Sequence, residues 1–127
     1  MAKDIIDRKE VVDVIKGAPA NFGRRGENLA REVIFDITAL KKDFPNGTFS
    51  LVLCRLGETE TYKATTVTIV GNELRYKPTS WATEMTGEGS WEIHVEEQST
   101  GVYAKSAVGR YFVSESLDQP VGNVPQT

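Results

Sequence analysis

The chain has 127 residues, a formal net charge of −3, 39% hydrophobic residues and 26% charged residues. This length suits one globular domain with a single core, and the mixed charges argue against nucleic acid, whose phosphates bind a basic face. The single cysteine excludes an intrachain disulfide. No apolar run is long enough for a membrane span or a signal-peptide core, so we expect a soluble protein that is made in the cytoplasm and binds no membrane.

The first quarter of the chain has a mixed pattern. We expect residues 1–10 to form a flexible N-terminal segment and Val11 to Lys16 to form a strand, because valine and isoleucine favour strands. The stretch from Ile5 to Ile15 also fits a helical pattern, so both alternatives stay open. Residues 18–28 are expected to form a loop.

A regular strand pattern begins after this loop. From Arg31 to Ile37 apolar and polar side chains alternate, which is typical of a half-buried strand. A turn is predicted at Phe44 to Gly47, because the Asn-Gly dipeptide favours tight turns. The run from Phe49 to Leu56 is apolar on both faces and predicts a central strand that is covered on both sides.

The clearest local prediction is a hairpin in the middle of the chain. The β-branched run Thr65 to Val70 and the alternating run Glu73 to Lys77 are separated only by Gly71 and Asn72. A two-residue Gly-Asn link is typical of a tight hairpin, with glycine at a position of positive φ. The connector that follows, residues 78–89, can include one helical turn that places Trp81 and Met85 on the core.

The last third of the domain is again strand-like. From Ser90 to Glu97 the pattern places Trp91, Ile93 and Val95 inward, and a turn at Ser99 to Gly101 follows. A last strand is predicted from Val102 to Val113, with a bulge or bend at Gly109. Residues 118–127 contain two prolines and a glycine, which predicts a disordered tail or linker.

Together these elements predict an all-β fold. About seven strands joined by short turns indicate an Ig-like antiparallel β-sandwich over residues 11–117. At most a short helical turn is expected, near residues 79–85. No helical crossover connects the strands, which excludes a parallel α/β sheet.

The sequence predicts neither a catalytic site nor a metal or cofactor site. His94 is the only histidine, and the alternation turns it outward between Glu92 and Glu96. A zinc site normally needs more histidine or cysteine ligands than one of each. Cys54 lies on the covered strand, where a free cysteine behaves as a small hydrophobic residue. A nucleophilic pair of Cys54 and His94 requires both to face one cleft, which the pattern does not support.

Three residues are candidates for binding. Arg24 and Arg25, flanked by Gly23 and Gly26, can hold a phosphate or a partner's carboxylate, although an exposed loop whose glycines set its turns is the favoured interpretation. Trp81, in the connector, is either part of the core or an exposed contact for a partner.

Two stretches of the sequence resemble a known family. In the first stretch, the polar segment from Gly26 to Arg31 precedes the strand at Glu32 to Ile37. In the second, the segment from Gly87 to Ile93 is followed by the segment from Lys105 to Val113. Over residues 26–117 this pattern is similar to the N-terminal Ig-like domain of phage baseplate upper proteins and related tail proteins. Residues 117–127 occupy the place where those proteins continue into a fibre or receptor-binding part.

The resemblance implies a structural, non-enzymatic domain of a phage or prophage tail, located in the virion. Its expected partners are other tail or baseplate proteins and further copies of itself, and neither nucleic acid nor a membrane is expected as a partner. One alternative is a carbohydrate-binding or adhesin-type Ig-like module of a bacterial surface protein, which predicts a row of exposed aromatic side chains. A small hydrolase is a third alternative and requires a cleft with convergent acids.

Overall fold

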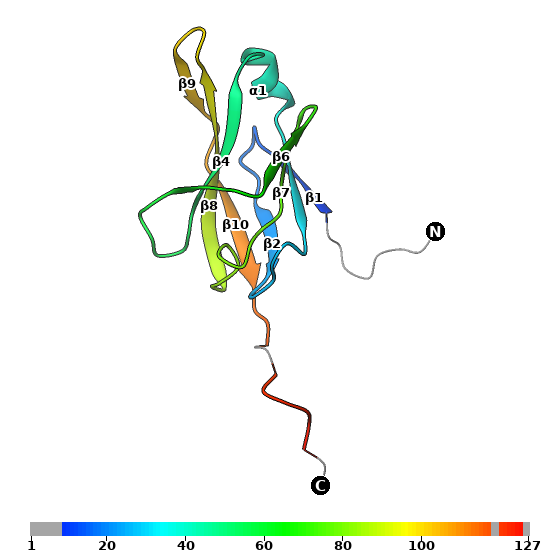
Figure 1. Cartoon of the computed structure of the whole chain (residues 1–127). Helices are drawn as coiled ribbons and strands as arrows, with labels where there is room; N and C mark the ends of the chain where they lie inside the picture. Colours follow the sequence, from blue (N-terminus) through cyan, green and yellow to red (C-terminus); the bar gives the residue numbers. More distant parts are fainter. Residues whose placement is uncertain (1–8, 118–119, 126–127) are drawn as a thin grey trace, which may run out of the picture.

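In a computed structural model, which describes residues 9–117 and 120–125, two β-sheets pack face to face as a sandwich (Figure 1). The predicted all-β sandwich is therefore confirmed. Of the predicted N-terminal segment 1–10, residues 1–8 lie outside the described part of the chain. The same holds for residues 118–119 and 126–127 of the predicted tail.

The first sheet has four strands in the order β1-β3-β7-β6. These are β1 (Lys9–Asp13), β3 (Glu32–Asp36), β7 (Glu73–Tyr76) and β6 (Val67–Val70). Strand β1 runs parallel to β3, whereas β3, β7 and β6 are antiparallel neighbours. The predicted hairpin joins β6 to β7, and Gly71 has the expected positive φ of 59°.

The second sheet has six strands, five of them in the order β2-β10-β8-β4-β5. These are β2 (Ala20–Arg24), β10 (Gly109–Ser114), β8 (Gly87–Glu97), β4 (Thr48–Cys54) and β5 (Tyr62–Lys63). The sixth, β9 (Val102–Lys105), pairs with the C-terminal half of β8, whereas β10 pairs with its N-terminal half. Strand β2 runs parallel to β10.

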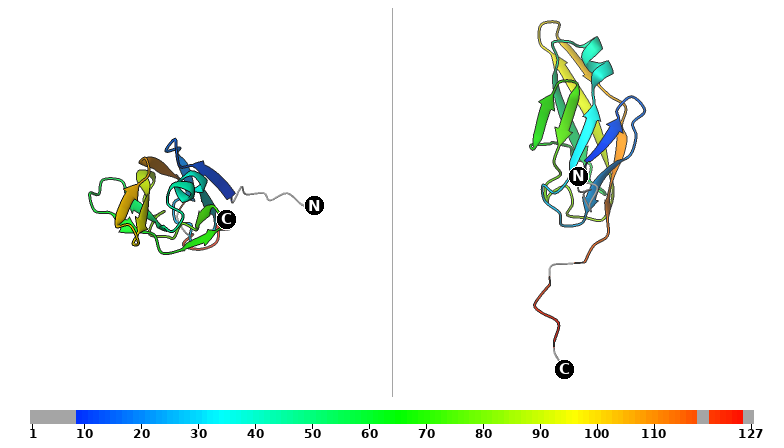
Figure 2. Two further views of the ribbon diagram at one scale, coloured as in Figure 1. Left: turned by 90° about the horizontal axis from the view of Figure 1, so that it is seen from above. Right: turned by 90° about the vertical axis from the view of Figure 1, so that its right-hand side faces the viewer.

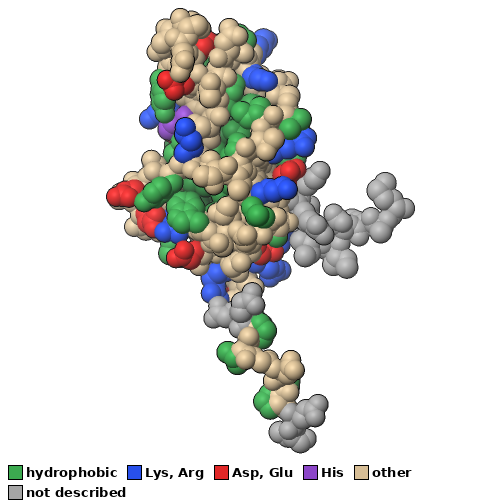
Figure 3. Space-filling view, in the orientation of Figure 1, with side chains coloured by type: hydrophobic (Ala, Val, Ile, Leu, Met, Phe, Trp, Pro, Cys, Tyr) green, Lys and Arg blue, Asp and Glu red, His purple; other side chains and the backbone are tan. Residues whose placement is uncertain are grey.

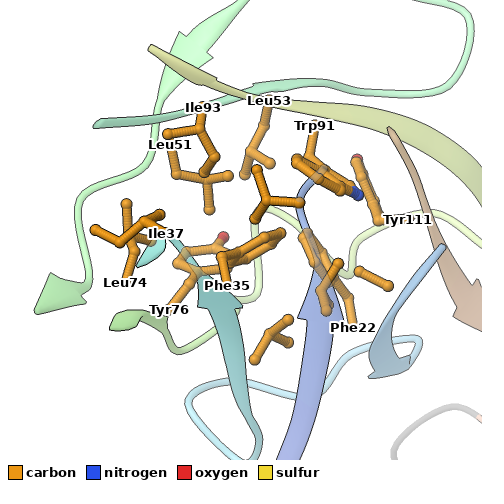
Figure 4. Close-up of a cluster of buried hydrophobic side chains, with 14 of the residues drawn as sticks. Phe22, Phe35, Ile37, Leu51, Leu53, Leu74, Tyr76, Trp91, Ile93 and Tyr111 are labelled. Carbon is orange, nitrogen blue, oxygen red and sulfur yellow. The ribbon is translucent and has the colours of Figure 1, made fainter. Parts of the chain in front are cut away.

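The core lies between the sheets and follows the alternation seen in the sequence (Figure 4). The inward residues predicted for the strands at 31–37, 49–56, 73–77 and 90–97 are all buried; they are Val33, Phe35, Ile37, Phe49, Leu51, Leu53, Leu74, Tyr76, Trp91, Ile93 and Val95. The ring of Phe35 meets Trp91 edge-on at 4.9 Å. The indole Nε1 of Trp91 donates a hydrogen bond of 3.2 Å to the carbonyl of Ala18, so its polar atom has a buried partner.

Several details differ from the prediction. The described part of the chain has ten strands, and two of the pairings are parallel. The expected loop at 18–28 contains β2, because Phe22 is fully buried and stacks on Tyr111 at 4.2 Å. A six-residue helix, α1 (Thr38–Asp43), was not predicted, and it buries none of its side chains.

Two further segments also differ in detail. A helical turn is present in the connector, where the amides of Ala82 and Thr83 both donate to the carbonyl of Thr79, but Met85 is 37% exposed and lies outside the core. The single strand predicted over 102–113 is divided into β9 and β10. Between them, Ser106 exchanges two hydrogen bonds with the main chain of Ile93 on β8.

In the part of the chain that the structure describes, no helix has the length and apolar character that a membrane span requires.

Candidate functional site

A groove of about 360 Å³ opens where β4 and β6 face each other at one side of the sandwich. Strand β5 pairs only with Val52 and Leu53, so among the described residues the first half of β4 has no strand partner on that side. The groove is lined by residues of β4, β5, β6, β8, β9 and the link between β5 and β6. Its lining is mixed in character, with hydroxyl groups, a lysine, a glutamate and aliphatic side chains.

A chain of three hydrogen-bonded side chains borders this groove. His94 turns outward, as predicted, but its side chain is only 14% exposed. Its Nε2 lies 2.5 Å from a carboxylate oxygen of Glu92, and its Nδ1 lies 2.7 Å from the hydroxyl oxygen of Tyr103. In the tautomer in which Nε2–H donates to the Glu92 carboxylate, Nδ1 accepts a hydrogen bond from the Tyr103 hydroxyl. The chain therefore fixes the exposed Tyr103 ring at the rim of the groove.

Cys54 and His94 do not form a pair. Cys54 lies opposite Ser90 in the register of β4 and β8, four residues away from His94 along β8. At the rise of a strand this separation is about 13 Å. The Cys54 thiol lies 3.1 Å from the carbonyl of Glu58 and lines a separate cavity of about 170 Å³. Among the described residues, no group of three His, Cys, Asp or Glu side chains is placed to hold a metal ion.

The two predicted arginines have different surroundings. Arg25 donates a hydrogen bond of 2.8 Å to the carbonyl of Ser116 and lies 3.4 Å from the carboxylate of Glu115. Its amide also donates to the carbonyl of Ser114, the last residue of β10. Arg25 therefore holds the segment that leaves the sandwich, whereas Arg24 is exposed.

The turn that carries these arginines is firmly attached to the connector. The buried hydroxyl of Thr83 donates to the carbonyl of Glu27 at 2.6 Å, and the amide of Gly26 donates to the carbonyl of Thr83. The Glu27 carboxylate accepts from Arg31 and from the amide of Arg24. Burial raises the pKa of Glu27, but these hydrogen bonds outweigh burial and hold the pKa below its ordinary value.

Trp81 belongs to a surface cluster that we call the Trp81 platform (Arg55, Tyr62 and Trp81). The Arg55 guanidinium lies 4.5 Å from the centroid of the Trp81 ring, and the Tyr62 ring meets Trp81 edge-on at 5.4 Å. Arg55 also pairs with Glu58 at 2.7 Å and donates to the main-chain carbonyl of Trp81. A cavity of about 200 Å³ opens beside Tyr62 and Trp81. Figure 3 shows apolar side chains among acidic and basic ones on this face, beside the β4–β5 loop.

Sequence reasoning did not identify Arg55, Tyr62 or Tyr103 as site residues. Arg55 and Trp81 are 26 positions apart, and no short motif joins them. Tyr62 lies in the two-residue strand β5 and is 46% exposed, and the sequence pattern around it gave no signal of this exposure.

No known protein-family model matches the chain, and no curated protein matches its sequence. Among solved structures, the fold is similar to the N-terminal domain of ORF48 of phage TP901-1, with a TM-score of 0.53 and 11% sequence identity. The match covers 84% of this chain and 98% of that domain. At this identity the likeness shows a shared fold, and it extends over nearly the whole of the phage domain.

Proposed function

We propose that this chain is a structural, non-enzymatic domain of a phage or prophage tail, which docks onto neighbouring tail or baseplate proteins in the virion. The observation that carries this proposal is the fold likeness to a domain of a phage protein over 98% of that domain. The resemblance of residues 26–117 to baseplate upper proteins supports it independently, because it rests on the sequence alone. Fold alone does not define function, so the proposal needs a direct test of location.

The Trp81 platform is the surface that we propose for docking. Tryptophan, tyrosine and arginine are the residues most enriched at the energetic centres of protein interfaces, and this cluster holds one of each, with a cavity beside Tyr62 and Trp81. The ion pair of Arg55 with Glu58 fixes the guanidinium before a partner arrives, which lowers the entropy cost of binding. The exposed Arg24 is proposed as a further contact. We propose that Arg25 directs the chain out of the sandwich rather than contacting a partner.

The location can be tested on purified phage particles from the source of the gene. Mass spectrometry should find the chain in the particles, and an antiserum against the domain should label the tail and not the capsid. If extensively purified particles contain no trace of the chain, the virion role is wrong.

The docking surface can be tested by supplying variant domains to assembling particles. Tyr62→Ala should reduce incorporation by about tenfold or more, because truncating a central interface residue weakens binding by that factor. Tyr103→Ala is the matched control, since Tyr103 is also exposed, at 57%, but borders the groove at His94. Equal incorporation of both variants would exclude the Trp81 platform as the docking surface.

The exposed tyrosines do not favour the glycan-binding alternative. That alternative predicts a row of exposed aromatic residues, whereas Tyr62 and Tyr103 are divided between two cavities.

A further inference from the structure

Strand β6 forms an edge of the first sheet: it pairs with β7, and none of the strands in the described part of the chain lies on its other side (Figure 2). Residues 65–70 read Thr-Thr-Val-Thr-Ile-Val, so every residue is β-branched and none is charged. Ile69 is 41% exposed and Val70 is 47% exposed. An uncharged, β-branched edge of this kind is the type that readily pairs with another strand.

The direction of the β6 main-chain groups follows from its pairing with β7. The amide of Lys77 donates to the carbonyl of Thr66, which therefore points toward β7. Because peptide groups alternate between the two sides of a strand, Thr68 and Val70 also bond to β7. The N–H and C=O groups of Val67 and Ile69 therefore point outward from the sheet edge, toward a new strand.

Strands β1, β2, β5 and β9, which also lie at sheet edges, carry features that prevent such pairing. At the β2 edge, the carboxylate of Glu10 accepts the amide of Asn21, and the Asn21 side chain accepts the amide of Gly23. Strand β5 is only two residues long and ends in a lysine. Strand β1 carries acidic residues and β9 ends in a lysine. Short strands and charged side chains are the usual protection of an edge, so β6 differs from its counterparts.

We propose that β6 pairs with β6 of a second copy of this chain, antiparallel and across a two-fold axis at Thr68. In this register Val67 of one copy lies opposite Ile69 of the other and exchanges hydrogen bonds with it. Thr68 lies opposite Thr68, and Thr66 lies opposite Val70. Two four-stranded sheets would thereby become one eight-stranded sheet.

Charge and side-chain pairing favour a second copy as the occupant. All pairs in this register are between β-branched residues, which stabilise antiparallel neighbours, and no like charges face each other. On β7, the next strand in the sheet, Glu73 and Arg75 are paired with each other at 2.7 Å, so they add no net charge to the contact. An isologous contact of this kind closes at two copies instead of growing into a fibre.

The contact is small. Stable dimers bury about 1,600 Å² in total, which short strands alone do not reach. We therefore expect a reversible dimer that forms as the protein concentration rises toward about 1 mM.

A charge exchange at the two-fold axis tests the proposal. Thr68 is exposed, so Thr68→Lys and Thr68→Glu should both fold. Each variant alone should remain monomeric in sedimentation velocity, because two like charges would face each other. An equimolar mixture of the two should recover a dimer at least as stable as that of the unchanged chain. Thr59→Lys, which adds the same charge on an exposed loop, should dimerise like the unchanged chain.

A backbone variant tests the register separately. Ile69→Pro removes one outward N–H but no hydrogen bond to β7, so it should abolish dimerisation while the thermal unfolding stays cooperative. The idea is refuted if the unchanged chain is monomeric at about 1 mM, or if the mixture of Thr68 variants fails to associate. Capture of a foreign strand by β6, with no self-association, would refute it as well. None of these outcomes depends on whether the chain is found in phage particles.

Discussion

Substitution of Gly109 by alanine gives a sharp test of how the second sheet is packed. Gly109 begins β10 and lies opposite Trp91 of β8. A Cβ atom at this position would overlap the Trp91 ring at Cε2, Cζ2 and Nε1. The φ of Gly109 is not positive, so alanine fits the backbone and the effect comes from overlap alone. The indole cannot move away freely, because it is fully buried and bonded to Ala18.

The overlap involves three atoms of a rigid ring, so we expect a cost at the upper end of the range for overpacked cores, about 3 kcal/mol. For a domain of this size this lowers Tm by roughly 10 °C. Circular dichroism during heating, together with urea unfolding, measures both quantities. Gly122→Ala is the control, because an added Cβ there meets no atom within 4 Å.

The reasoning can be checked further with a double-mutant cycle. Trp91→Phe removes ring atoms that the new Cβ would overlap, at the expense of a cavity and the hydrogen bond to Ala18. The cost of Gly109→Ala should therefore be smaller in the Trp91→Phe background, with a coupling energy of about 1 kcal/mol or more. Strict additivity of the two changes, or a Gly109→Ala variant as stable as the unchanged chain, would show that this packing argument is wrong.

Three other results are expected. Burial raises the pKa of Tyr76 and of Tyr111 to about 12. Because unfolded tyrosines ionise near pH 10, the urea concentration at the unfolding midpoint should decrease as the pH rises from about 10 to about 12. A midpoint that does not change over this pH range would contradict the prediction. Thr83→Val should lower the free energy of unfolding by about 1–3 kcal/mol, because it leaves a buried carbonyl without its donor, whereas Thr83→Ser should retain most of it. Arg25→Ala should change stability by less than about 1 kcal/mol, yet speed proteolysis just after β10, and an unchanged cleavage rate would argue against its anchoring role.

The core residues could be predicted wherever one face of a strand is buried and the other face is exposed to solvent. In that case the two-residue period of a strand appears directly in the sequence, as it does in Trp91, Ile93 and Val95. The hairpin at Gly71 and Asn72 could also be predicted from the sequence, because a two-residue turn leaves few alternative registers.

The pairing of the strands could not be predicted from the sequence in the same way. Periodicity assigns the face of a side chain but neither the neighbour nor the direction of its strand, so the parallel pairing of β1 with β3 could not be inferred. Strand β2 has the sequence Ala-Asn-Phe-Gly-Arg, which has low intrinsic strand propensity. It is a strand because burying Phe22 between Tyr76 and Tyr111 outweighs that propensity.

The candidate site shows the same limit. Trp81 could be selected from the sequence because a tryptophan in a polar connector is unusual. Its partners could not, since the guanidinium of Arg55 reaches it only through the packing of the β4–β5 loop on the connector. Arg25 was selected as a binding residue for its charge, and the structure places it in contact with the chain's own residues after β10.

The proposed pairing through β6 also determines how two copies would face in an assembly. A two-fold axis at Thr68 reverses the direction of every strand, so it points the two C-terminal segments away from each other. In each copy this segment leaves the sandwich at the end where β10 stops, while β6 lies at the side of the first sheet (Figure 1). Copies that point the same way cannot be related by this axis. The β6 contact therefore suits two opposed copies.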